Sequence, residues 1–143
     1  YPCGRHPAKD GEILKTSRYT SAGPGAPGSV MTILFRLGSQ EYVAFNGGPM
    51  FQFTEAISLV VKCTDQEEVD YYWERLTEGG AESQCGWLKD RFGVSWQVIP
   101  DALPEIFAGT DKEGVQRAMQ AMLKMRKIDV AALQAAYKGV TVS

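Results

Sequence analysis

The feature that most constrains the fold is one amphipathic helix expected over residues 64–80, between two β-branched segments. Its apolar side chains recur at spacings of three and four residues, and these are Val69, Tyr72, Trp73 and Leu76. Thr64 and Glu67 have the spacing of a capping box at the start of the helix, and Gly79 and Gly80 supply its stop. Such a helix is expected to cover the apolar face of a sheet.

Short segments rich in β-branched and apolar residues predict strands at residues 13–19, 29–37, 41–48, 57–63, 82–89 and 93–100. Tight turns join 29–37 to 41–48 and 82–89 to 93–100, so each pair is expected to form a hairpin. The two hairpins also suggest a weakly repeated unit. Glycine and proline exclude both a helix and a strand from residues 20–28.

The C-terminal part predicts two helices. The first covers residues 111–127 from a Thr110/Glu113 capping box, and the second runs from Asp129 to Gly139. A stripe at helical spacing indicates packing rather than cofactor contact, and it consists of Val115, Met119, Met122 and Met125. The elements together predict the α+β class.

Side chains alternate between the two faces of a strand, which gives the strands one apolar face and one mixed face. Trp96 and Val98 share one face of the last strand, whereas Ser95 and Gln97 share the other. The mixed faces carry Asn46, Ser58, Ser95 and Gln97. Two interpretations stay open: the mixed face is exposed, as is common in antiparallel sheets, or it lines a pocket. Short uncharged polar groups among apolar residues are typical of a pocket.

Composition restricts the class of partner. The chain has 143 residues, the size of a single domain, with a net charge of -2 and dispersed lysines and arginines, which does not favour nucleic-acid binding. No apolar run has the length of a membrane span or marks a signal peptide. Three cysteines without a C-x-x-C pair favour free thiols and a reducing compartment. We therefore expect a cytoplasmic protein without nucleic-acid or membrane partners.

The segments NGGPMFQFTEAISLVV, TDQEEVDYYWERLTEGG, CGWLKDRFGVSWQVIP and MQAMLKMRKIDVAALQAAYKG together resemble the PhnB-like proteins, also called 3-demethylubiquinone-9 3-methyltransferase-like domains. These belong to the vicinal oxygen chelate superfamily, with glyoxalase I, bleomycin-resistance proteins and extradiol dioxygenases. The resemblance covers residues 28–139. It implies glyoxalase-like paired β-α-β-β-β modules whose curved mixed sheets surround a cleft, and a homodimer. We expect an N-terminal tail over 1–12, the glyoxalase-like domain over 13–100 and a helical extension over 101–143.

The resemblance also explains why a glutamine lies in the last strand. DRFGVSWQ is similar to the superfamily's D-P-x-G-x-x-x-E ending, whose final Glu binds a metal, and Gln97 stands at that position. The superfamily's metal-binding histidine would fall near Ala56 or Ser58, and the only histidine, His6, lies in the tail. A divalent site needs three or more good ligands, so no tightly bound metal is expected by the usual scheme.

A second departure from the family lies at the N-terminus, where a strand and a helix normally precede the equivalent of residues 13–19. The first β-α of module one is therefore expected to be missing or altered, which would leave a sheet edge for a partner to cover. No cofactor is predicted. A divalent metal remains an option with incomplete ligands, for which Glu55 or Gln52 would be needed.

Catalytic motifs are not evident. The run GPGAPG is followed by a strand and not by a helix, and its prolines remove amide donors, so it does not resemble a loop for a methyl donor. Cys85 has no histidine near it in the sequence, which favours a structural thiol, although it remains a candidate at a pocket mouth. The place of Asp90 in a tight turn is explained by turn geometry.

The leading hypothesis is a small-molecule-binding protein. Its cleft would use aromatic walls from Trp87, Phe51 and Tyr42, with Cys85 at the mouth and orienting groups from Asn46, Ser58 and Gln97. The alternative is an enzyme acting in the same cleft, either 3-demethylubiquinone-9 3-methyltransferase-like or a metal-dependent lyase or dioxygenase. A third hypothesis is a structural dimer with a vestigial cleft.

Overall fold

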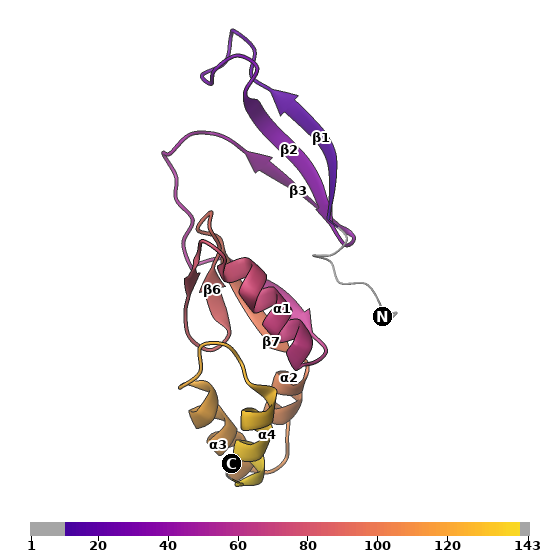
Figure 1. The fold of residues 1–143 in the computed structure, drawn as a ribbon, viewed down its shortest axis with the longest axis vertical. Helices are drawn as coiled ribbons and strands as arrows, with labels where there is room; N and C mark the ends of the chain where they lie inside the picture. Colours follow the sequence, from indigo (N-terminus) through magenta and orange to yellow (C-terminus); the bar gives the residue numbers. More distant parts are fainter. Residues whose placement is uncertain (1–10, 141–143) are drawn as a thin grey trace. The chain divides into compact units, whose positions relative to one another are not determined.

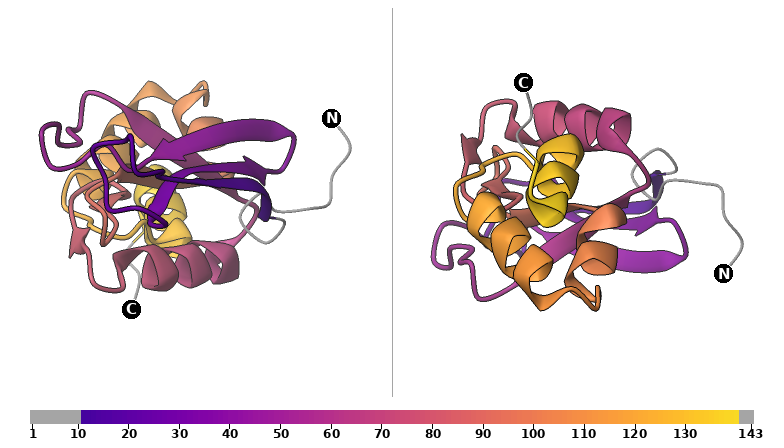
Figure 2. Two further views of the ribbon diagram at one scale, coloured as in Figure 1. Left: turned by 90° about the horizontal axis from the view of Figure 1, so that it is seen from above. Right: turned by 90° about the horizontal axis from the view of Figure 1, so that it is seen from below.

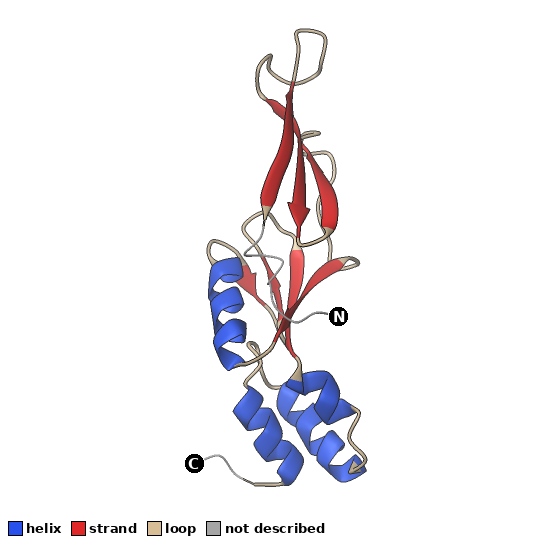
Figure 3. Ribbon diagram, turned by 90° about the vertical axis from the view of Figure 1, so that its right-hand side faces the viewer, coloured by secondary structure: helices blue, strands red, loops and turns tan. Residues whose placement is uncertain are grey.

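The computed structural model describes residues 11–140, which form two compact units with a boundary between Phe51 and Gln52. Each unit contains one sheet, and the helices of the described residues all belong to the second unit (Figures 1 and 3). The predicted α+β class is therefore confirmed. The tail expected at residues 1–12, with His6, lies outside the described residues apart from its last two positions.

The first unit is an antiparallel sheet of β1 (Glu12–Arg18), β2 (Val30–Leu37) and β3 (Gln40–Phe45), in that order. A two-residue turn joins β2 to β3, with Leu37 opposite Gln40 and a positive φ of 58° at Gly38. The hairpin predicted over residues 29–48 is confirmed, although its second strand ends at Phe45. No helix occurs in residues 11–51.

The glycine-rich loop after β1 is explained by the ring of Tyr19, the one apolar residue of 11–51 that is buried, with 8% of its surface exposed. A Cβ at Gly25 would collide with this ring, and a Cβ at Gly23 would lie 2.7 Å from its Cδ1. The loop closes around Tyr19 because these positions lack side chains.

The second unit has the element order β-α-β-β-β. It consists of β4 (Ser58–Cys63), α1 (Gln66–Thr77), β5 (Ala81–Glu82), β6 (Trp87–Lys89) and β7 (Ser95–Pro100). The sheet order is β4-β7-β6-β5, where β4 and β7 are parallel and the other pairs antiparallel. This is the mixed sheet that the resemblance implies.

Helix α1 lies against one face of this sheet (Figures 1 and 3). The buried cluster between them contains the predicted helical face and the apolar strand face: Val61, Cys63, Val69, Tyr72, Trp73, Leu88 and Val98. The N-cap of α1 is Asp65 and not Thr64, because the Asp65 carboxylate accepts a hydrogen bond from the amide of Glu68 at 2.9 Å. In return, the Glu68 carboxylate accepts a hydrogen bond from the Thr64 amide. The capping box therefore lies one residue later than predicted, whereas Gly79 marks the stop as expected, with φ 72°.

The strand predicted over residues 82–89 is wrong in its middle. Residues 83–86 leave the sheet between β5 and β6, and Cys85 has a φ of 58°, in the left-handed region. The amides of Cys85 and Gly86 donate to the carbonyls of Met125 and Arg126, at 2.9 and 2.8 Å. These donors bind the C-terminal segment instead of a neighbouring strand, which a local pattern does not reveal.

Three helices, α2 (Ala102–Phe107), α3 (Lys112–Met122) and α4 (Val130–Lys138), lie together beyond the end of β7 (Figures 1 and 2). Helix α2 was not anticipated. Helix α3 begins after Asp111 rather than Thr110, and it ends at Met122 rather than at residue 127. Helix α4 confirms the predicted cap at Asp129 and the left-handed Gly139.

The predicted stripe of α3 is shifted. Gly114 and Ala118 are its buried residues, whereas Met119 is exposed and Val115 half-buried. Met122 and Met125 do pack against the buried cluster of Leu103, Ala118, Ile128 and Leu133. Small residues take the inner positions because α4 approaches closely: a Cβ on Gly114 would lie 2.8 Å from the Tyr137 carbonyl. Within residues 11–140, no helix is long and apolar enough to cross a membrane.

Candidate functional site

The candidate site lies on the face of the second sheet that α1 does not cover. Pairing across β4, β7 and β6 aligns residues of this face in two rows, Ser58–Ser95–Lys89 and Val60–Gln97–Trp87. The predicted sharing of one face by Ser58, Ser95 and Gln97 is therefore confirmed. The next residue of β7 on this face, Ile99, packs against the C-terminal helices, which limits the open region to these two rows.

Gln97 and Ser58 form the polar centre of this face. The Gln97 side-chain nitrogen Nε2 donates to Ser58 Oγ at 2.8 Å, and both residues are half-buried. This bond orients the amide, and within residues 11–140 nothing donates to Gln97 Oε1. The amide therefore offers one oriented acceptor, directly opposite the indole of Trp87 in the strand register.

A hollow of about 220 Å³ adjoins this centre and is lined by Glu55, Ala81, Glu82, Ser83, Trp87, Leu88, Lys89 and Ser95. Ser95 is 2% exposed, and its hydroxyl has no hydrogen-bond partner among the described residues. Lys89 Nζ lies 2.5 Å from Glu55 Oε1. An unsatisfied buried hydroxyl costs free energy, and a bound group that reached it would recover that cost.

The carboxylates at this hollow are ionised at neutral pH. The hydrogen bond from Lys89 lowers the pKa of Glu55 most, followed by a backbone hydrogen bond at Glu55 and the charge of Lys89. The pKa of Glu82 is lowered chiefly by the indole of Trp73, which donates to Glu82 Oε1 at 2.9 Å, and further by Arg126. Glu82 is therefore engaged on the α1 side and beside Arg126, whereas Lys89 is the one side-chain partner of Glu55 among residues 11–140.

The two cysteines of the described residues have structural contacts. The Cys85 thiol donates to the carbonyl of Met122, at 3.6 Å, and so helps to hold the end of α3. Cys63 is fully buried beneath α1, and desolvation raises the pKa of its thiol to about 12. Cys63 therefore stays protonated and packs as an apolar group.

The remaining predicted site residues belong to the first unit. Asn46 follows β3 and is exposed; its Nδ2 donates to the Val30 carbonyl at 3.4 Å, and its own carbonyl accepts the Tyr19 hydroxyl at 2.7 Å. Tyr42 stacks on Phe35 with ring centroids 5.5 Å apart, and Phe51 is 88% exposed. The convergence of these three residues with Gln97 on one hollow stays a prediction, because they lie in different units.

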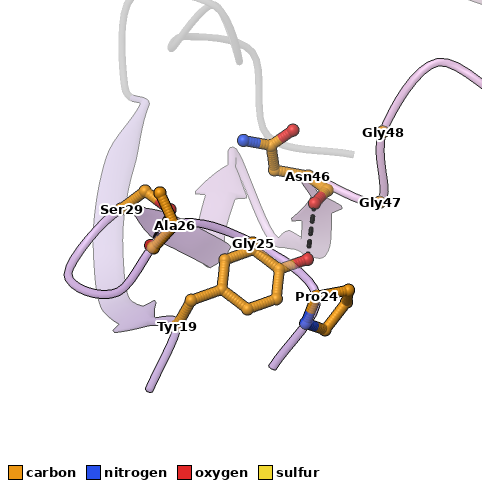
Figure 4. Close-up of a pocket in the computed structure, with 8 residues that line it drawn as sticks. All are labelled: Tyr19, Pro24, Gly25, Ala26, Ser29, Asn46, Gly47 and Gly48. Carbon is orange, nitrogen blue, oxygen red and sulfur yellow. Dashed lines mark hydrogen bonds between the residues drawn. The ribbon is translucent and has the colours of Figure 1, made fainter. Parts of the chain in front are cut away.

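Asn46 also borders a hollow of about 230 Å³ within the first unit, lined by Tyr19, Pro24, Gly25, Ala26, Ser29, Asn46, Gly47 and Gly48. Figure 4 shows the Tyr19 ring beside the loop of Pro24 and Gly25, with the side-chain amide of Asn46 directed away from the ring. The amide nitrogen is directed to the Val30 carbonyl, so the amide oxygen is the atom of this group that a ligand could approach.

The side chains present do not fit the metal site that the superfamily implies. Among residues 11–140, no three His, Cys, Asp or Glu side chains come together as a metal-binding group. Gln97 uses its amide nitrogen on Ser58, and Glu55 is paired with Lys89, which leaves a single amide oxygen as a ligand.

Sequence reasoning missed Lys89 and did not recognise the burial of Ser95. Both could have been found, because Lys89 has the same strand parity as Trp87, and the register of the hairpin then places it beside Ser95. The partnership of Lys89 with Glu55 had no local signal, since 34 positions of chain separate them.

Comparison with known proteins decides the family. A model of the family described as 3-demethylubiquinone-9 3-methyltransferase matches residues 7–99. The chain belongs to the 3-demethylubiquinone-9 3-methyltransferase family. The matched region contains the first sheet, α1 and all of the second sheet except Pro100, and ends before the C-terminal helices. Membership in this PhnB-like family confirms the resemblance found in the sequence.

Several solved structures are similar to this chain. A PhnB protein from Bacillus cereus is 36% identical, with a TM-score of 0.58, over 64% of this chain and 80% of that chain. A protein from Pseudomonas aeruginosa is 20% identical, with a TM-score of 0.43, over 55% and 71% of the two chains. A protein from Staphylococcus aureus is 27% identical, with a TM-score of 0.29, over 65% and 77%. None of the proteins with a curated description matches this chain.

Proposed function

We propose that this member of the 3-demethylubiquinone-9 3-methyltransferase family binds a small organic molecule on the open face of its second sheet. The observation that carries the proposal is the Gln97 amide, oriented by Ser58 at 2.8 Å on the face opposite α1, with Trp87 across from it. A fixed neutral acceptor beside an indole recognises a planar molecule with a hydrogen-bond donor.

A merely solvated sheet face is a poorer explanation. Val60 is 54% exposed beside Gln97, and Trp87 lies on the other side, so apolar side chains flank the polar centre. The hydroxyl of Ser95 lies buried without a partner next to them. Apolar walls with few polar groups are typical of binding sites, and they are uncommon on faces that only contact water.

The other ligand contacts predicted from the sequence are part of this proposal. These contacts are Asn46, Tyr42 and Phe51 of the first unit, and Cys85 of the second unit is a further one. Phe51 and Asn46 are both exposed, so a ligand can reach their side chains. Methyl transfer is suggested by the name of the family. The loop of residues 23–28 closes around Tyr19 and gives no support for a methyl-donor site.

Titration of the ¹⁵N-labelled chain with neutral planar amides such as benzamide tests the proposal. We expect saturable shifts at the side-chain amide of Gln97 and the indole N–H of Trp87. The Gln97→Ala variant should weaken binding about 5- to 10-fold, the value of one hydrogen bond of about 1 kcal/mol. Gln120→Ala, the same change on the exposed face of α3, is the matched control. Unchanged affinity in Gln97→Ala, or shifts confined to other surfaces, would refute the proposal.

A further inference from the structure

We propose that the hollow beside Trp87 is a subsite for the carboxylate of a planar organic acid, and that Glu55 stands in for that carboxylate. The inference rests on the proposed function, because the body of the acid would lie on the Trp87–Gln97 row. It specifies that the ligand is negatively charged, which the neutral pair of Gln97 and Ser58 does not determine.

Lys89 supplies the first part of the subsite. It projects from β6 on the open face, next to Ser95 in the register, and already holds a carboxylate oxygen of Glu55 at 2.5 Å. The contact demonstrates the chemistry that this hollow accepts: an ammonium group positioned to bind an anionic oxygen.

Glu55 is suited to exchange with a ligand. Its side chain is 63% exposed, it precedes β4 in a segment without regular structure, and Lys89 is its one side-chain partner among residues 11–140. Exposed ion pairs of this kind contribute little to stability, so a ligand carboxylate competes with Glu55 at little cost.

Ser95 supplies the second part. Ser95 lines the hollow next to Lys89, and its buried hydroxyl has no partner within the described residues. A carboxylate has two oxygens, so one can bind Lys89 while the other accepts the Ser95 hydroxyl proton. Glu55 contacts Lys89 and leaves this hydroxyl unsatisfied.

The charge balance of the hollow favours an anion once Glu55 has moved. Glu82 is the other carboxylate of the lining, and it is held by the Trp73 indole and lies 3.4 Å from Arg126. Displacement of Glu55 therefore leaves the Lys89 ammonium as the charge without a counter-ion. Trp87 forms a wall of the same hollow, which favours a flat or aromatic body next to the carboxylate.

Three aromatic probes of different charge separate the classes of ligand: benzoate, its neutral isostere benzamide, and cationic benzylamine. Each is titrated into the full chain by calorimetry and ¹⁵N NMR. We expect benzoate to bind about 5-fold or more tightly than benzamide. Glu55→Gln removes the competitor, so it should tighten benzoate binding about 2- to 5-fold, the range of an exposed ion pair. Glu74→Gln, on the exposed face of α1, is the control for the change in net charge.

Lys89→Gln should weaken benzoate binding about 10-fold or more and leave benzamide binding nearly unchanged, with Lys112→Gln as its control. If Lys89 only shaped the hollow, Lys89→Gln would weaken the binding of benzoate and benzamide equally. Glu55→Gln would then not tighten benzoate binding. Because Glu55 is exposed, its variant keeps the test decisive even if Lys89→Gln fails to fold.

The outcomes distinguish this inference from the proposed function. If benzamide shifts Gln97 and Trp87 but benzoate is no tighter and Glu55→Gln has no effect, the carboxylate subsite is wrong and the binding face stands. Tighter binding of benzylamine also overturns the subsite, because it would make the hollow a cation site. If no probe binds at this face, both proposals fail.

Discussion

The turn between β6 and β7 depends on one carboxylate, and its replacement by an amide should be costly. Asp90 Oδ1 accepts the amides of Phe92 and Val94 at 2.9 and 3.0 Å, and Oδ2 accepts the indole N–H of Trp96 at 3.0 Å. Trp96 in turn packs against the cluster beneath α1. Asp90 therefore holds the turn between β6 and β7 and, through Trp96, links this turn to the core beneath α1.

The expected cost of Asp90→Asn follows from the number of acceptors. An asparagine that keeps its oxygen on the two amides turns its NH₂ group toward the indole N–H of Trp96, and two donors then face each other. One hydrogen bond to a charged acceptor is lost and the half-buried indole is left unpaired. Such a loss is about 1.5–3 kcal/mol, so we expect the free energy of unfolding to fall by about 2 kcal/mol.

Urea unfolding followed by far-ultraviolet circular dichroism measures this change without relying on the fluorescence of Trp96. In a Trp96→Phe background the donor is absent, so Asp90→Asn should cost at least about 1 kcal/mol less than in the wild type. Asp101→Asn is the matched control, since Asp101 precedes α2 without a side-chain capping bond. Additive effects of the two substitutions, or a stable Asp90→Asn variant, would refute this reasoning.

Three further predictions concern packing, acid sensitivity and assembly. Gly114→Ala should destabilise by about 1–3 kcal/mol by overpacking, because its Cβ would lie 2.6 Å from Asp111 Oδ2; the gain in stability typical of Gly→Ala in a helix would contradict this close approach. The hydrogen bond from Lys127 is the main cause that lowers the pKa of Asp70, so its stabilisation is present above about pH 4 and is lost as the pH falls through the folded pKa. Lys127→Met should therefore destabilise more at pH 7 than at pH 3 in urea unfolding, and equal losses would exclude the pairing. We also propose that the chain forms a homodimer that covers exposed apolar residues such as Phe51; sedimentation velocity should give a dimeric mass that Phe51→Ser reduces, and a monomeric wild type would exclude it.

The elements with local signals were predicted well. The apolar face of α1 needed only the spacing of Val69, Tyr72 and Trp73, and the ends of α4 needed only Asp129 and Gly139. Errors occurred where a distant segment supplied the partner. The strand over 82–89 failed because the amides of Cys85 and Gly86 bind carbonyls some forty residues later.

The candidate site was predicted in part for the same reason. Strand parity alone put Ser95 and Gln97 on one face, but the bond between Gln97 and Ser58 required the parallel pairing of β4 with β7. The ion pair between Lys89 and Glu55 likewise joins two segments that no motif connects.

The sequence by itself determined the apolar face of α1, the ends of α4 and which side chains of one strand share a face, because these depend on a few neighbouring residues. Only the tertiary structure decided which strands became neighbours. That pairing in turn decided which side chains lie together on the open face. Neighbours in a sheet are selected by the burial of whole surfaces, a sum over distant residues that no single segment of the chain encodes.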